Sequence, residues 1–76
     1  MEKLTERIVI DPKVMHGKPV IMGTRVPVEI VLGSLAGGME VKEVCNEYGL
    51  KREDVLAAID YATKIISNED VILLNA

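Results

Sequence analysis

One stretch of thirteen residues decides the fold, and it reads His16-Gly17-Lys18-Pro19-Val20-Ile21-Met22-Gly23-Thr24-Arg25-Val26-Pro27-Val28. Its two glycines and two prolines predict sharp changes of chain direction. The residues before it indicate a short strand, and those after it indicate mostly helix. We therefore interpret the stretch as the junction between a strand-and-loop arm, residues 1–26, and a helical part that begins at residue 27.

A short β-branched run, Arg7-Ile8-Val9-Ile10-Asp11, precedes the junction and is closed by Pro12. Such a run predicts a strand with a stop signal. A strand this short needs a partner, which is either Val20-Ile21-Met22 or the C-terminal Ile72-Leu73-Leu74, the latter within the chain or in a second subunit. Its free edge also makes strand exchange between two copies a hypothesis.

Two short helices are predicted to follow, each ended by glycine. The first begins at Pro27, with Thr24 as a possible cap, and ends at Gly37-Gly38. The second opens at Glu40 and ends at Gly49. Both show apolar residues at i, i+3, i+4 and i+7. These are Val28, Val31, Leu32 and Leu35 in the first helix, and Val41, Val44, Cys45 and Tyr48 in the second.

A third and longer helix is predicted from Arg52, and Ser67-Asn68 is expected to end it. Its apolar stripe consists of Val55, Ala58, Ile59, Ala62, Ile65 and Ile66. Residues 67–76 then form a tail that carries the apolar run Val71–Leu74. This run either packs against the third helix or adds as a strand to a partner or a sister subunit.

Composition limits the class of protein. Seventy-six residues make one domain whose core must come from aliphatic side chains, since the chain has no Trp or Phe. The single cysteine excludes an intrachain disulfide and a cysteine zinc cage, and it fits a cytoplasmic protein. No run is long enough to span a membrane, and no cofactor is expected. The net charge is −3, but residues 1–26 carry +2 and residues 27–76 carry −5, so an anion-binding surface is expected in the N-terminal third.

The order of elements predicts a mainly α fold: a three-helix cluster over residues 27–66, preceded by a short N-terminal β-strand. A short helix, a turn with Gly49 and a longer helix form the helix-turn-helix pattern. If the cluster binds DNA, the third helix lies in the major groove, and Lys51 and Arg52 at its start contact bases or phosphates. The same helix pair also occurs as plain structural packing.

The central motif resembles the signature of domain-of-unknown-function family 433. The resemblance rests on Ile8-Val9-Ile10-Asp11-Pro12, Gly17-Lys18-Pro19-Val20-Ile21, Gly23-Thr24-Arg25-Val26-Pro27-Val28 and Glu53-Asp54-Val55, and covers about residues 7–62. It implies a homeodomain-like fold and a VapB-like antitoxin: a homodimer that binds operator DNA and neutralises a PIN-like ribonuclease toxin. The chain departs from the family at two helix caps, where Glu40 and Lys51 stand in place of Ser or Thr, so both caps are expected to be weaker.

Two cations in the junction have two interpretations each. Arg25 either binds a phosphate or carboxylate with two parallel contacts, or bonds loop carbonyls and fixes its own turn. Lys18 either contacts backbone phosphate or is simply solvated.

His16 lacks a neighbouring nucleophile or further metal ligands, so a loop hydrogen bond is its expected role. Cys45 is expected to be a small core residue.

The resemblance implies an antitoxin-type DNA-binding regulator. An enzyme is not expected, because the sequence holds no acid–base pair or nucleophile with a base. Lys18, Arg25, Lys51 and Arg52 are the predicted DNA-binding residues. The predicted partner-binding residues are Glu40, Glu43 and Glu47, which otherwise form a solvated face, and Ile72, Leu73 and Leu74 in the tail. The alternative is a protein-interaction module that binds no DNA of its own.

Overall fold

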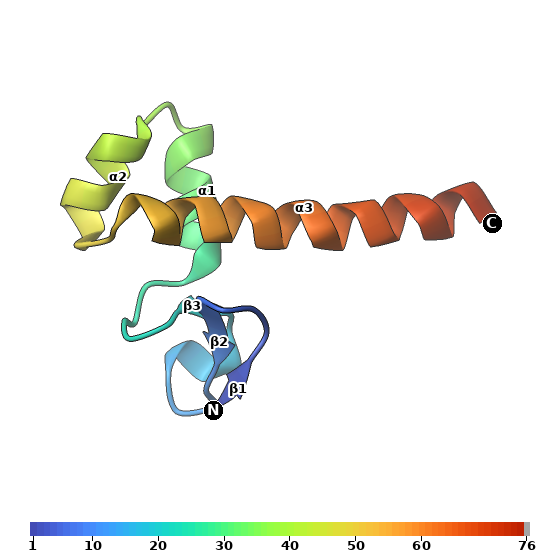
Figure 1. The fold of residues 1–76 in the computed structure, drawn as a ribbon, viewed down its shortest axis with the longest axis horizontal. Helices are drawn as coiled ribbons and strands as arrows, with labels where there is room; N and C mark the ends of the chain where they lie inside the picture. The colour runs from blue at the N-terminus through green and yellow to red at the C-terminus, as the bar shows by residue number, and fades with distance from the viewer. Residues whose placement is uncertain (76) are drawn as a thin grey trace.

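The computed structural model describes the backbone of residues 1–75 and the side chains of residues 1–68. A small sheet packs beneath three helices, of which the third runs across the length of the molecule (Figure 1). In chain order, the described elements are β1 (Glu2–Lys3), β2 (Ile8–Ile10), the 3-10 turn η1 (Met15–Gly17), β3 (Val20–Ile21), α1 (Val28–Ala36), α2 (Val41–Tyr48) and α3 (Arg52–Asn75). The expected N-terminal strand and three-helix cluster are therefore confirmed.

The sheet has the order β1-β2-β3, and both pairs are antiparallel. Strand β2 pairs with β3 through Ile8 opposite Ile21 and Val9 opposite Val20, which confirms the partner within the chain. Strand β1 was not expected, because Glu2-Lys3 has no β-branched residue. It pairs with the other side of β2, so the prediction that β2 has a free edge for strand exchange is wrong.

The junction turns at Thr24 and enters α1 at Pro27, its N-cap residue. The hydroxyl of Thr24 donates to the carbonyl of Ile21 over 2.7 Å and accepts from the N–H of Val26 over 3.0 Å. Thr24 therefore closes the turn after β3, and the prediction that it caps α1 is wrong. The physical reason is distance along the chain: three residues, Arg25, Val26 and Pro27, separate Thr24 from Val28, the first residue of α1.

The core lies where the sheet meets the three helices. Side chains from β2, β3 and all three helices fill it. Its buried members are Ile8, Ile21, Val28, Val31, Val44, Leu50, Val55 and Ala58. Cys45 is half-buried and packs against this cluster, as expected of a small core residue.

The ends of α2 are fixed by its neighbours in sequence. Gly49 adopts φ +66°, the left-handed conformation that ends a helix, and its N–H bonds the Cys45 carbonyl. At the start of α2 the carboxylate of Glu43 accepts the backbone N–H of Glu40 over 2.9 Å. This bond offsets the weaker cap expected at Glu40, because the Glu43 carboxylate accepts a backbone N–H that would otherwise be unpaired at the start of the helix.

Helix α3 is longer than the sequence suggested. The expected end at Ser67-Asn68 is wrong, because the backbone remains helical through Asn75. A stretch predicted as a possible strand is thus part of the helix, since its apolar residues suit either state. The partner-binding prediction for Ile72, Leu73 and Leu74 concerns side chains outside the described residues. No helix within residues 1–75 combines the length and apolar character that a membrane crossing requires.

Candidate functional site

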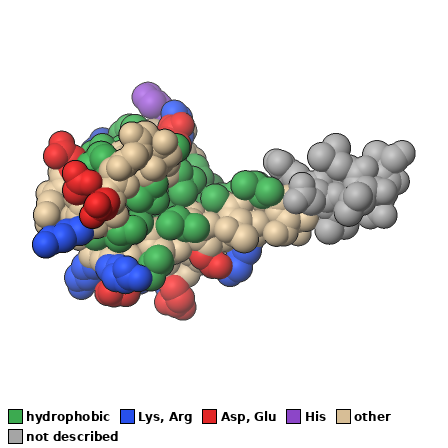
Figure 2. Space-filling view, turned by 90° about the horizontal axis from the view of Figure 1, so that it is seen from above, with side chains coloured by type: hydrophobic (Ala, Val, Ile, Leu, Met, Phe, Trp, Pro, Cys, Tyr) green, Lys and Arg blue, Asp and Glu red, His purple; other side chains and the backbone are tan. Residues whose placement is uncertain are grey.

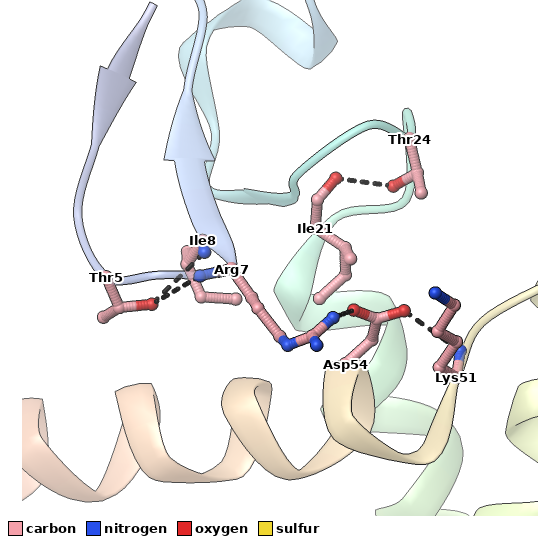
Figure 3. Close-up of polar contacts among 7 residues, drawn as sticks. All are labelled: Thr5, Arg7, Ile8, Ile21, Thr24, Lys51 and Asp54. Atoms are coloured by element: carbon pink, nitrogen blue, oxygen red, sulfur yellow. Dashed lines mark hydrogen bonds and ion pairs between the residues drawn. The ribbon is translucent and has the colours of Figure 1, made fainter.

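The start of α3 is held by one buried carboxylate, that of Asp54 (Figure 3). Its Oδ1 accepts a hydrogen bond from Arg7 Nη1 at 2.9 Å, which is also an ion pair. Its Oδ2 accepts the backbone N–H of Lys51 at 3.0 Å. The same side chain therefore caps α3 and ties it to the N-terminal arm.

Arg7 is placed by the turn that precedes β2. The hydroxyl of Thr5 accepts the N–H groups of Ile8 and Arg7 at 3.2 and 3.4 Å. The carbonyl of Arg7 accepts the N–H of Met22 at 2.8 Å, which joins this turn to the end of β3. The guanidinium thus reaches Asp54 from a backbone that is fixed on both sides.

Lys51 and Arg52 are both exposed where α3 begins. The Asp54 carboxylate accepts the backbone N–H of Lys51, so this bond does not involve the Lys51 ammonium group (Figure 3). Within residues 1–68, neither cationic side chain has an ion pair. A helix N-terminus that carries two unpaired cations is a suitable surface for an anion, because the free N–H groups and the helix dipole add to the charge.

Arg25 and Lys18 lie in different settings. Arg25 is exposed, and within the described side chains it makes no hydrogen bond, so the loop-carbonyl interpretation is wrong. It follows Thr24 in the turn after β3. Lys18 instead forms an ion pair with Glu29 of α1. Of the two junction cations, Arg25 is therefore unpaired within residues 1–68, whereas Lys18 is paired.

The predicted acidic residues of α2 are exposed at Glu40, Glu43 and Glu47, and Glu43 is partly used in the helix cap. Glu53 and Asp60 add exposed carboxylates along α3, where Asp60 pairs with Lys64 at 2.9 Å. The negative charges of Glu53 and Asp60 therefore follow Lys51 and Arg52 along α3. This arrangement restricts any contact with a polyanion to the beginning of α3.

His16 lies in η1 and is exposed (Figure 2). Its φ is +56° and that of Met15 is +50°, both uncommon for residues with a side chain. The expected loop hydrogen bond of its imidazole is not among those of the described side chains. Within the same part of the chain, no three His, Cys, Asp or Glu side chains gather as metal ligands would.

A second feature, a groove between α1 and α3, was not predicted. It encloses about 350 Å³ and is mostly apolar. Its walls are Lys18, Pro19, Val28, Glu29, Leu32, Tyr61, Ala62, Ile65 and Ile66. The signal in the sequence was the length of the apolar stripe of the third helix, which exceeds what two short helices can cover.

Sequence reasoning also missed the Arg7–Asp54 pair. Acids in the first turn of a helix, such as Glu53 and Asp54, are favourable there whether or not they have a distant partner. The usable signal was a carboxylate three residues after the N-cap, a spacing that commonly returns a bond to the cap. Nothing in the sequence identifies Arg7 as the partner, because the two residues are 47 positions apart.

Comparison with known proteins places this architecture in a family. A family model described as "Protein of unknown function (DUF433)" matches residues 8–62. The chain is 33% identical over 64 residues to the uncharacterized protein Rv2308 of Mycobacterium tuberculosis, a match that covers 84% of this chain and 27% of that protein. It is 71% identical over 24 residues to an uncharacterized protein of Archaeoglobus fulgidus, covering 32% and 67% of the two chains.

Solved structures show the same fold. A DUF433 member from Anabaena variabilis aligns with TM-score 0.74 and 32% identity, over 93% of this chain and 71% of that one. The crystal structure of Rv2018 from Mycobacterium tuberculosis aligns with TM-score 0.64 and 35% identity, over 68% and 24%. This chain thus spans about a quarter of the length of Rv2308 and Rv2018. On the family match and these alignments together, the chain belongs to the DUF433 family.

Proposed function

We propose that the protein is an antitoxin-type, DNA-binding regulator with a homeodomain-like helix-turn-helix, as its resemblance to VapB-like proteins implies. The observation that carries the proposal is the arrangement of α2, the Gly49 turn and α3, in which Asp54 is used internally while Lys51 and Arg52 are exposed. In this function the protein is cytoplasmic, forms a homodimer, binds operator DNA and neutralises a PIN-like nuclease.

The first turn of α3 is the part that enters the major groove. Recognition helices contact base edges with their N-terminal residues, and Arg reads guanine with two hydrogen bonds. Arg52 is the proposed base contact and Lys51 a phosphate contact. Arg25, which is exposed in the turn after β3, is a second phosphate contact, and Lys18 is the weakest candidate because Glu29 already pairs with it.

Charge limits the affinity expected from this surface. Arg25 and Lys51, the two proposed phosphate contacts, would neutralise about two phosphates, which corresponds to a slope of about −2 for log affinity against log salt concentration. The exposed acids Glu53 and Asp60 prevent a longer contact along α3. The protein alone should therefore bind DNA weakly, and a basic nuclease partner would strengthen binding by adding its own cations.

A gel-shift titration with the promoter fragment next to the protein's own gene tests the proposal. The double variant Lys51→Ala and Arg52→Ala should lose at least about tenfold in affinity and reduce the salt slope by about 1, since only Lys51 of the two contacts a phosphate. The matched control, Lys13→Ala with Lys64→Ala, removes the same charge elsewhere on the surface and should bind within about twofold of the parent. Equal losses in both variants, or none in the first, would reject a groove contact at α3.

A protein-interaction module without DNA binding is the second candidate. Exposed apolar side chains on α3 favour it, among them Leu56 and Ile59 at 44% and 38% exposure. Glu40 and Glu47 on α2 would then meet a basic nuclease, and Ile72, Leu73 and Leu74 would contribute the apolar contact. Purified PIN-like nuclease should bind the protein and lose that binding with Glu40→Lys plus Glu47→Lys. The absence of DNA affinity in the complex would select this candidate over the first.

A further inference from the structure

Helix α3 presents one continuous apolar face of which only the first half is covered. Val55 and Ala58 are fully buried against the other helices and the sheet. Further along, Ile65 and Ile66 are 41% and 54% exposed, although they continue the stripe that Val55 begins. Figure 1 shows that the C-terminal part of α3 extends well past α1.

The uncovered face borders the groove between α1 and α3, which we call the α1–α3 groove and which has the nine lining residues given above. Its lining includes Val28 and Leu32 of α1 and Tyr61 and Ala62 of α3. It also includes Ile65 and Ile66, which are 41% and 54% exposed. The chain thus offers a concave apolar surface directly beside a ridge of isoleucines, and an interface between two identical copies needs both of these from each copy.

The paired charges around this surface favour a partner whose own contact surface carries no unpaired charge, such as a second copy of this chain. On a helical projection, Asp60 and Lys64 fall on the side of α3 away from Ala62 and Ile66, and they pair with each other. At the rim of the groove, Lys18 and Glu29 are likewise paired. Among the described residues, a strongly basic or acidic partner finds no unpaired opposite charge at this face, and two copies that meet through it bring no unpaired like charges together there.

The spacing along α3 suits a two-fold axis. Ile59, Ala62 and Ile66 follow one another at steps of three and four residues, the spacing of a seam between two helices. Their midpoint lies at Ala62, so an antiparallel crossing there brings Ile59 of each copy against Ile66 of the other. The small side chain of Ala62 permits close approach of the two helices at the crossing.

We propose that the α1–α3 groove and the face of α3 formed by Ile59, Ala62, Ile65 and Ile66 bind a second copy of this chain, with the two α3 helices antiparallel across a two-fold axis near Ala62. The inference rests on the homodimer of the proposed function and adds the surface that forms it. In a helix-turn-helix dimer this surface also sets the separation of the two DNA half-sites.

Sedimentation equilibrium of the full chain tests the interface. The parent should be a dimer, and Ile66→Glu should raise its dissociation constant at least about tenfold, since it introduces a charge into an apolar contact. The matched control is Ile30→Glu, because Ile30 on α1 is 43% exposed but does not line the groove. Circular dichroism melts should show that both variants fold. A monomeric parent, or equal effects of the two substitutions, would overturn the proposal.

Disulfide trapping tests the geometry independently. In a Cys45→Ser background, Ala62→Cys should crosslink to itself in an oxidising buffer, because the two residues face each other near the axis. Asp60→Cys, on the opposite side of α3, should remain uncrosslinked under the same conditions. Crosslinking of the second variant but not the first would reject this interface.

The outcomes separate the interface from the DNA-binding proposal. A dimer that fails to shift promoter DNA rejects DNA binding alone. A monomer that shifts DNA and depends on Lys51 and Arg52 rejects the interface alone. If the chain is monomeric and Ile66→Glu abolishes capture by a PIN-like nuclease, the groove belongs to that partner and the proposal of a second copy is wrong.

Discussion

Arg7 and Asp54, separated by 47 residues in the chain, form an ion pair at 2.9 Å that joins the N-terminal arm to the start of α3. Because the second oxygen of Asp54 accepts the N–H of Lys51, docking of the arm and capping of α3 depend on one carboxylate. Opening the arm therefore exposes the first turn of α3, and the two regions should unfold locally as one unit.

Asp54→Ala should cost about 2 kcal/mol of unfolding free energy, because it removes a helix cap and an ion pair together. Arg7→Ala should cost about 1 kcal/mol, since the Arg7 side chain is 39% exposed and the bond to Lys51 remains. Urea denaturation of each variant measures both values. The control Glu53→Ala removes a charge from the same turn and should change stability by less than about 0.5 kcal/mol. An Arg7 variant less stable than the Asp54 variant would contradict the shared role of this carboxylate.

Gly49→Ala should destabilise the protein by about 1 kcal/mol, because Gly49 has φ +66° and a side chain is strained in that conformation. An added Cβ meets no atom within 4 Å there, so the loss is conformational and not steric. Gly33 lies within α1 and also has open space around its Cβ position. Gly33→Ala should therefore stabilise by about 0.5–1 kcal/mol. Thermal melts of both variants measure the two shifts, and shifts of the same sign would refute this account.

Thr24→Val should cost about 1 kcal/mol, since it leaves the N–H of Val26 without its acceptor and removes the bond to the Ile21 carbonyl. The adjacent Arg25→Ala should change the free energy of unfolding by less than about 0.5 kcal/mol. In the gel-shift assay the order should reverse. Arg25→Ala should weaken DNA binding and reduce the salt slope by about 1, whereas Thr24→Val should leave the slope unchanged. A large stability loss in the Arg25 variant would show a structural role.

Glu43→Ala should destabilise the protein by about 0.5–1 kcal/mol, because the N–H of Glu40 loses the carboxylate that caps it. Glu47 is exposed on the same helix, so Glu47→Ala is the matched control and should be nearly neutral. Chemical denaturation of the two variants gives the comparison. Equal stability of both would mean that the bond at 2.9 Å adds nothing to the folded state.

Local patterns predicted most of the fold. The i, i+3, i+4, i+7 spacing placed α1 and α2 correctly, and Gly49 adopts the left-handed conformation that its position suggested. The pairing of β2 with β3 was one of two alternatives that the sequence left open, and the structure confirms it. Each of these features depends on interactions between residues close in sequence.

The rest depends on contacts that spacing does not encode. The end of α3 was misplaced because Ser67-Asn68 is a weak stop, and nothing in the pattern shows whether an apolar stripe has a partner. The candidate site was predicted only in part. The exposure of Lys51 and Arg52 follows from their place before the apolar stripe of α3. The ion pair of Lys18 with Glu29 is a tertiary contact, which the sequence pattern does not encode. The Arg7–Asp54 pair is invisible for the same reason.

The sheet controls how copies of this chain can associate. One edge is β1, only two residues long and carrying Glu2 and Lys3, which discourages a further strand. At the other edge, the N–H of Ile21 and the carbonyl of Pro19 already bond residues 26 and 28 within the chain. Neither edge offers a row of open backbone groups, so concentrated protein should resist fibrous polymerisation.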